Sequence, residues 1–235
     1  MIGIICAMQI EADGLIALAD NTQTENIAGM KFTTGKLYGK DIAVVVCGVG
    51  KVNAAMCTVV LLEKYHPEAV VNSGVAGALS PLVSIGDIVV ATKAVEHDMN
   101  TTALGAKQGE VSFPDETVMF FECDKNISNT LAEVCKNIPD TRVEQGIVAS
   151  GDMFVSKRSQ RLRINDEFGA LACEMEGAAI GHVCYSYDTP YGILRAISDD
   201  LDENKGMDFV KFCELASKKT VIAMSEFIKL FSDTP

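Results

Sequence analysis

The chain has 235 residues, of which 48% are hydrophobic, so it is long enough to bury the core of one α/β domain. Its formal net charge of -12 argues against a surface for nucleic-acid phosphates, which would need clustered Lys and Arg side chains. No apolar run approaches the roughly 20 residues of a membrane helix, and an apolar strand follows Met1 without a basic leader. We therefore expect a cytoplasmic protein that binds neither nucleic acid nor membranes.

Apolar strands alternate with helical segments along most of the chain. We expect strands at 2–7, 30–38, 41–47, 69–73, 87–95, 142–149, 170–175 and 191–197. We expect helices at 8–18, 51–65, 126–136, 157–166, 176–187 and 207–231, of which 157–166 is polar and typical of an exposed helix. This alternation predicts an α/β fold.

Two glycine motifs and one long loop separate these elements. The motif GVGK at 48–51 lacks the length and the Ser or Thr of a phosphate-binding P-loop, so we interpret it as a turn between a strand and a helix. The motif GVAG at 74–77 is predicted to be a turn whose amide groups can approach a ligand. Residues 98–114 have little periodicity and are expected to be a functional loop or an interface.

Three carboxylates each follow a predicted strand. Glu11 follows the first strand, and Glu176 and Asp199 follow the two strands of a predicted βαβ unit, which we expect to be parallel. Taken singly, each of these carboxylates is explained as well by a structural role: Glu11 and Glu176 by the first turn of a helix, and Asp199 by capping of a loop. Together with the GVAG turn and the loop at 150–155, they predict one crevice.

The residue types in this crevice indicate acid/base chemistry. The eight cysteines form no CxxC pair and the three histidines are scattered, so we expect reduced thiols, no metal and no cofactor. Phe154 could offer an aromatic platform for a planar ring, although packing on the core explains it equally well. Several carboxylates without a Ser/His or Cys/His pair suggest cleavage of a glycosidic bond through an oxocarbenium-like transition state.

Several segments also resemble a known family. IGIICAM, GVGKVNAA, NSGVAGAL, SGDMFV, EMEGAAIGHVC and RAISD occur in an order similar to that of the purine nucleoside phosphorylase and nucleosidase superfamily. More narrowly, they resemble bacterial 5'-methylthioadenosine/S-adenosylhomocysteine nucleosidases. The resemblance implies a single three-layer α/β/α domain over residues 1–235 around a twisted mixed sheet, and a homodimer that releases adenine from both nucleosides by hydrolysis.

The resemblance assigns roles to the three carboxylates and their neighbours. It implies that Glu11 activates water, that Asp199 protonates the purine at N7, and that Ser198 orients Asp199. It implies that Glu176 binds the ribose hydroxyls, with Met175 packing under the sugar.

The remaining implied contacts involve the base and the 5' substituent. Phe154 corresponds to the ring that stacks on adenine and Val155 to the residue whose backbone reads the base edge. Val75 stands where several family members have serine, so Gly77 is expected to contribute through its backbone. Leu104 corresponds to the residue that closes the 5' pocket of the neighbouring subunit. The residues that complete the implied substrate site are Met8 and Phe209.

Three other functions remain open at the level of the sequence. A nucleoside phosphorylase would need a cationic phosphate clamp, and the chain has no arginine before Arg142. A futalosine-type nucleosidase would share the catalytic acids and differ in the 5' pocket. A nucleoside-sensing binding protein would need neither Glu11 nor Asp199.

Overall fold

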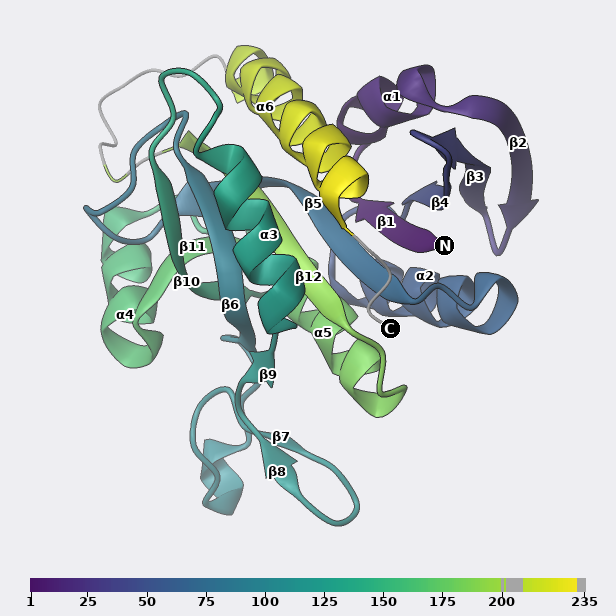
Figure 1. Cartoon of the computed structure of the whole chain (residues 1–235). Coiled ribbons are helices and arrows are strands. Elements are labelled where there is room, and N and C mark those ends of the chain that lie inside the picture. The colour runs from purple at the N-terminus through teal and green to yellow at the C-terminus, as the bar shows by residue number, and fades with distance from the viewer. Residues whose placement is uncertain (200, 202–208, 232–235) are drawn as a thin grey trace.

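A computed structural model describes residues 1–199, 201 and 209–231, with the side chains of 209–213 excepted. A ten-stranded mixed sheet forms its centre, with nine strands in the order β11-β10-β6-β12-β5-β1-β4-β3-β2 and β9 paired to β6 (Figure 1). The strands are β1 (Ile2–Cys6), β2 (Asp20–Ile27), β3 (Met30–Leu37), β4 (Lys40–Val46), β5 (Ala69–Ala78), β6 (Ile88–Glu96), β9 (Phe121–Glu122), β10 (Val143–Ser150), β11 (Ala170–Glu174) and β12 (Tyr191–Asp199).

Helices cover both faces of this sheet, which confirms the three-layer α/β/α architecture. The helices are α1 (Gln9–Leu18), α2 (Lys51–Tyr65), α3 (Lys125–Cys135), α4 (Arg158–Phe168), α5 (Gly177–Ser186) and α6 (Phe209–Leu230). Side chains alternate between the faces, as they do along any strand. Ile4 packs in the core beneath α1, α3 and α6, whereas Ile5 packs in the core beneath α2 and α5. Helix α4 packs beside β10 and β11.

The sheet closes on itself at one side, and this corrects the prediction for the βαβ unit. β5 pairs in parallel with β12 and antiparallel with β11, so β11 and β12 run in opposite senses and are not neighbours. The prediction that the two strands are parallel is therefore wrong. Their carboxyl ends nevertheless meet, because β11 crosses to the end of β5 at Ala78 and Gly77.

The GVAG motif is part of a strand, so the predicted turn is also wrong. β5 continues to Ala78 because β12 remains paired with it as far as Gly77 and β11 pairs with its last two residues. The prediction also missed β2, a strand of mostly exposed polar residues at the edge of the sheet. Its sequence, DNTQTENI, lacks the apolar alternation by which a strand is recognised.

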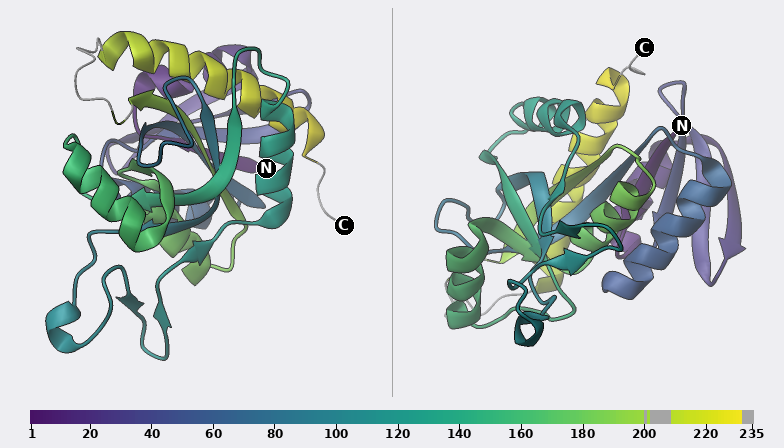
Figure 2. Two further views of the ribbon diagram at one scale, coloured as in Figure 1. Left: turned by 90° about the vertical axis from the view of Figure 1, so that its left-hand side faces the viewer. Right: turned by 90° about the horizontal axis from the view of Figure 1, so that it is seen from below.

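The segment between β6 and β9 protrudes from the body of the molecule (Figures 1 and 2). It contains a 3-10 turn, Thr102–Leu104, and a short ribbon of β7 (Val111–Ser112) and β8 (Thr117–Val118).

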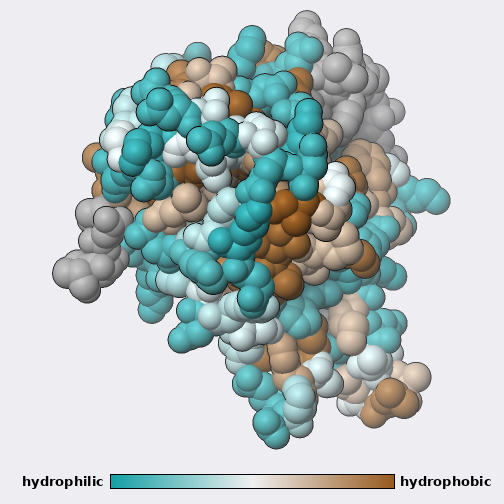
Figure 3. Space-filling view, turned by 90° about the vertical axis from the view of Figure 1, so that its right-hand side faces the viewer, coloured by the Kyte–Doolittle hydropathy of each residue, from teal (hydrophilic) through white to brown (hydrophobic). Residues whose placement is uncertain are grey.

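The face in Figure 3 is largely hydrophilic, with a hydrophobic patch near its centre. Among the helices formed by the described residues, none has the length and apolar character needed to span a membrane.

Candidate active site

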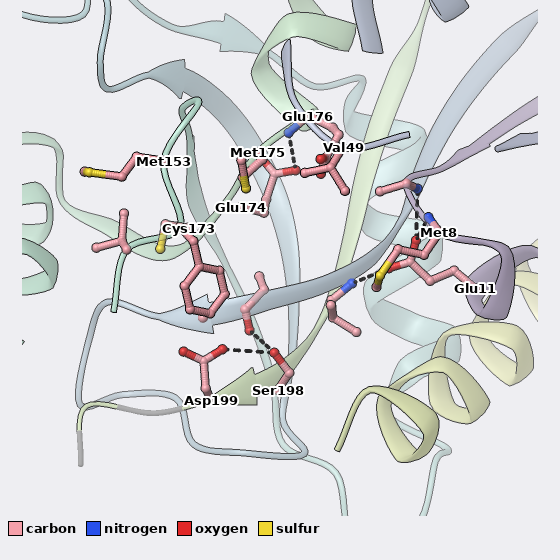
Figure 4. Close-up of a pocket in the computed structure, with 16 residues that line it drawn as sticks. Met8, Glu11, Val49, Met153, Cys173, Glu174, Met175, Glu176, Ser198 and Asp199 are labelled. Atoms are coloured by element: carbon pink, nitrogen blue, oxygen red, sulfur yellow. Dashed lines mark hydrogen bonds between the residues drawn. The ribbon is translucent and has the colours of Figure 1, made fainter. Parts of the chain in front are cut away.

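Loops and strand ends enclose one pocket at the side where the sheet closes (Figure 4). Glu11 and Asp199 lie at opposite ends of this pocket. Glu174 and Glu176 lie along the wall between these two ends. The residues that line it are Ala7, Met8, Glu11, Val49, Val75, Ala76, Gly77, Met153, Phe154, Val155, Cys173, Glu174, Met175, Glu176, Ser198 and Asp199. The three predicted carboxylates therefore share one pocket, as the sequence analysis predicted.

Glu11 is held in the first turn of α1 by backbone amides. The amides of Ala7 and Met8 donate hydrogen bonds of 2.9 Å each to Oε2, and the amide of Val75 donates one of 3.3 Å to Oε1. Burial raises the pKa of Glu11, although these amides and the charge of Arg195 oppose the rise. A buried carboxylate with a raised pKa, facing a pocket, suits a general base.

The two glycines of the GVAG motif leave room for the acids at the two ends of the pocket. A Cβ on Gly74 would lie 2.9 Å from Oε1 of Glu11, and a Cβ on Gly77 would lie 2.9 Å from Oδ2 of Asp199. Both distances are too short for a carbon in contact with oxygen. The two glycines are therefore explained by the close approach of the Glu11 and Asp199 side chains to strand β5 rather than by a turn.

Asp199 is bound through both of its carboxylate oxygens. The Ser198 hydroxyl donates to Oδ1 at 3.0 Å, and the Arg161 guanidinium forms a buried salt bridge with Oδ2. Arg161 also donates to the carbonyl oxygens of Val155 at 3.0 Å and Ala78 at 3.4 Å. The contact between Ser198 and Asp199 agrees with the orienting role implied for Ser198. Arg161 was missed, because it lies in a helix whose polar sequence predicted exposure, yet it is buried.

A buried ion pair between Arg195 and Glu174 lies next to Glu176, the third predicted carboxylate. Arg195 forms a salt bridge with Glu174, and the amides of Glu176 and Gly177 donate to Glu174 Oε2 at 3.0 and 2.8 Å. Burial opposes ionisation of Glu174, but the charge of Arg195 and hydrogen bonds from Ser150, Arg195 and the Gly177 amide lower its pKa. Neither Glu174 nor Arg195 was predicted as a site residue, although a single arginine inside an apolar strand indicates a buried partner.

The negative charge of Glu176 is less well stabilised than that of Glu174. Burial, followed by repulsion from Glu174, raises the pKa of Glu176 to about 7. The charge of Arg195 and one hydrogen bond, from the amide of Gly50 to Oε1 at 3.0 Å, oppose this rise in pKa. A carboxylate so placed would gain stability from hydroxyl groups that donate to it, as those of a ribose can.

One side of the pocket is formed by the loop after β10, which contributes Met153, Phe154 and Val155. Phe154 is 60% exposed at the pocket, so it does not pack in the core as the alternative interpretation would require, whereas Val155 is buried. Met175 and Met8 line the pocket as well. An aromatic ring that lines a pocket can stack on a planar ligand.

Two predicted site residues are not placed in this pocket. Leu104 is 87% exposed on the protruding segment and does not line the pocket of its own chain. Phe209 is the first residue of α6, and its side chain lies outside the described residues. Within the described ranges, no group of three or more His, Cys, Asp or Glu side chains is arranged to hold a metal ion.

Proteins similar to this chain in sequence and in fold have the same activity in their names. Residues 1–229 match the model of the phosphorylase superfamily. The chain is 37% identical to a 5'-methylthioadenosine/S-adenosylhomocysteine nucleosidase of Bacillus thuringiensis subsp. konkukian over 92% of this chain and 93% of that one. It is 33% identical to the enzyme of the same name from Shewanella loihica, over 97% and 98%.

A solved structure of similar fold has a ligand in its description. The Neisseria meningitidis 5'-methylthioadenosine/S-adenosylhomocysteine nucleosidase, in complex with methylthio-immucillin-A, superimposes with a TM-score of 0.91 at 30% identity and covers 98% of this chain and 99% of that one. With the near full-length sequence matches, this similarity extends over the whole sheet and the pocket. The chain belongs to the phosphorylase superfamily, in the family of 5'-methylthioadenosine/S-adenosylhomocysteine nucleosidases.

Proposed function

We propose that this protein hydrolyses the N-glycosidic bond of 5'-methylthioadenosine and S-adenosylhomocysteine, releasing adenine and the 5-thio-substituted ribose. The observation that supports this function most strongly is the placement of Glu11 and Asp199 at opposite ends of one pocket, with Glu176 between them. A base on one side and an acid on the other are what hydrolysis of a glycosidic bond requires.

The proposed reaction uses each carboxylate differently. Glu11 takes a proton from a water molecule, which attacks the anomeric carbon of the ribose. Glu176 accepts hydrogen bonds from the ribose hydroxyls, and its charge stabilises the cationic sugar that develops as the bond breaks. Asp199 gives a proton to N7 of the departing adenine, which stacks on Phe154.

The proton transfer from Asp199 requires a change at the base side of the pocket. Both oxygens of Asp199 are engaged, by Ser198 and by Arg161. Asp199 therefore has to take up a proton, which weakens its ion pair with Arg161, before it can donate to N7. Arg161 also binds the Val155 carbonyl, so we expect it to remain part of the wall around the base.

The two arginines buried beside this pocket, Arg161 and Arg195, are each already paired with a carboxylate, which argues against the phosphorylase alternative. Arg195 is buried in this pocket region, but its guanidinium is bonded to Glu174 and to the side-chain oxygen of Asn72. A phosphate clamp would need a guanidinium that can turn toward an anion. Releasing Arg195 would leave Glu174 as a buried carboxylate without its cation, which is unfavourable.

We also propose that the protein is a homodimer in which Leu104 of each subunit contacts the 5' substituent in the other. Leu104 is exposed on a protruding segment, where it is available to a second copy. In addition, α2 exposes Val52, Met56 and Val59, which are spaced so as to lie on one side of the helix. The cytoplasmic location expected from the sequence remains a prediction.

Adenine release from a set of 5'-substituted adenosines, with and without phosphate, tests the proposed function. We expect release from the methylthio and homocysteinyl compounds at the same rate in both buffers. A strict need for phosphate would favour a phosphorylase, and preference for a futalosine-type nucleoside would favour that nucleosidase. Binding of the nucleosides without any release of adenine would favour a sensing protein.

A further inference from the structure

The GVGK motif has contacts that a simple turn between a strand and a helix does not need. Gly48 and Gly50 have φ values of 85° and 99°, which favour glycine, and Gly50 is the N-cap of α2 without a capping side chain. Two carboxylates from distant parts of the chain take the place of that cap. The Gly50 amide donates to Oε1 of Glu176 at 3.0 Å, and the Lys51 amide donates to Oδ1 of Asp152 at 2.8 Å.

Glu176 lines the pocket, and Asp152 lies next to the pocket residues of the loop after β10. Glu176 lies on the side proposed to bind the ribose, and Asp152 directly precedes Met153 and Phe154 on the side proposed to bind the base. The positive end of the α2 dipole favours both carboxylates. The N-terminus of α2 therefore contacts both halves of the site at once.

The side chain of Lys51 strengthens the connection to the base loop. Its Nζ atom lies 2.7 Å from Oδ1 of Asp98, and Oδ2 of Asp98 accepts the amide hydrogen of Asp152 at 2.8 Å. Asp152 is thus held through its side chain by the Lys51 amide and through its backbone by Asp98. Burial of Asp98 would raise its pKa, but the hydrogen bonds from Lys51 and Asp152 lower it.

The same ammonium group also reaches the helix that follows Glu176. Nζ of Lys51 lies 2.9 Å from Oε2 of Glu96, whose Oε1 atom is 2.9 Å from Nδ1 of His182 on α5. Glu176 is the N-cap of α5. One ammonium group is therefore shared by Glu96, which is buried, and Asp98, which is exposed, so its loss would leave both carboxylates without this partner.

We propose that Lys51 is a positioning residue, which fixes the base loop relative to Glu176 so that adenine and ribose are bound in one rigid geometry. This inference rests on the proposed function, because that function assigns the two halves of the pocket. Loss of the ammonium group should release Asp98, and with it the backbone of Asp152, so that Phe154 is no longer held at one place beside the base.

The test compares Lys51→Met with Lys64→Met. Lys64 lies on the same helix and pairs with Glu25, but that pair is on the surface and away from the pocket. Calorimetric titration with adenine should show at least about ten-fold weaker binding to Lys51→Met, the order expected for loss of one hydrogen bond to a charged group. Lys64→Met should bind adenine as the wild type does, and Lys51→Arg should recover most of the lost affinity.

A second variant keeps the test valid if Lys51→Met does not fold. Asp98→Ala interrupts the path from the ammonium group to Asp152 while keeping the cation, so it should weaken adenine binding in the same way. Because both changes act through one path, the double variant should bind adenine no more weakly than the worse single variant. Adenine affinity that is unchanged in Asp98→Ala, or losses that add in the double variant, would overturn the proposal.

Failure of this inference can be told from failure of the proposed function. If the wild type does not release adenine from any nucleoside, the proposed function is wrong. If the wild type releases adenine but Lys51→Met binds it like Lys64→Met, only the role of Lys51 is wrong.

Discussion

Replacing Glu176 by glutamine is expected to stabilise the protein while impairing its function. The rise in the pKa of Glu176 from an ordinary 4.5 to about 7 means that the folded protein disfavours the ionised form. At 1.36 kcal/mol for each pKa unit, this rise corresponds to about 3 kcal/mol. Glutamine keeps the size of the side chain and can still accept the Gly50 hydrogen bond, but it carries no charge.

The sign of the effect follows from proton binding. Between pH 4.5 and 7 the folded state holds the Glu176 proton more tightly than the unfolded state does. The stability that this proton contributes is therefore fully present below pH 4.5 and is lost as the pH rises to about 7. Urea unfolding at pH 8 should therefore show Glu176→Gln to be more stable than the wild type by up to about 3 kcal/mol. At pH 5 the difference should fall below about 1 kcal/mol.

Glu174→Gln is the matched control, two residues earlier in the same pocket. Burial disfavours the charge of Glu174, but the bond to Arg195 lowers its pKa, so removing its charge leaves Arg195 buried without a carboxylate. This variant should be less stable than the wild type at pH 8. The reasoning would be refuted if Glu176→Gln were less stable than the wild type at pH 8, or if its gain were the same at pH 5.

Three further predictions concern the reaction. Glu11 must be ionised to act as the base, and burial raises its pKa, so kcat/KM should begin to fall on the acid side at a higher pH than for an ordinary glutamate. A kcat/KM profile that is flat between pH 5 and 8 would contradict this prediction. Asp199→Asn should lose roughly 10² to 10⁴ in kcat while it still binds the nucleoside, and near-normal turnover would remove Asp199 from its role. Leu104→Asp should weaken binding of 5'-methylthioadenosine more than binding of adenine; light scattering would show whether dimers persist, and equal losses for both ligands would place the 5' pocket within one chain.

The sequence predicted most of the sheet and helices because their burial patterns are regular. Residues 2–7, for example, form a continuous apolar run, and the strand that they predicted is buried throughout. It could not predict that β5 runs through the GVAG motif, since that depends on pairing with β11 and β12, which are distant in sequence. β2 was missed because an exposed edge strand needs no apolar face.

The candidate site was predicted in part for a similar reason. Glu11, Glu176 and Asp199 follow strands, and a carboxylate at the end of a strand can be recognised in a sequence. Arg161 and Arg195 could not be found in that way, because each is explained by a carboxylate that only the fold brings to it. Arg161 lies in a polar helical segment, where a buried arginine is not distinguished from an exposed one, whereas the apolar strand around Arg195 was a sign of its burial.

The fate of phosphate tests the central claim most directly. Wild-type protein would be incubated with 5'-methylthioadenosine and inorganic phosphate, and phosphorus NMR would follow the phosphate while adenine release is measured. Hydrolysis by Glu11, Glu176 and Asp199 predicts that adenine is released completely while the phosphate signal remains unchanged. A sugar 1-phosphate signal that grows in proportion to the adenine would show that the protein is a phosphorylase and would contradict the roles proposed for these residues.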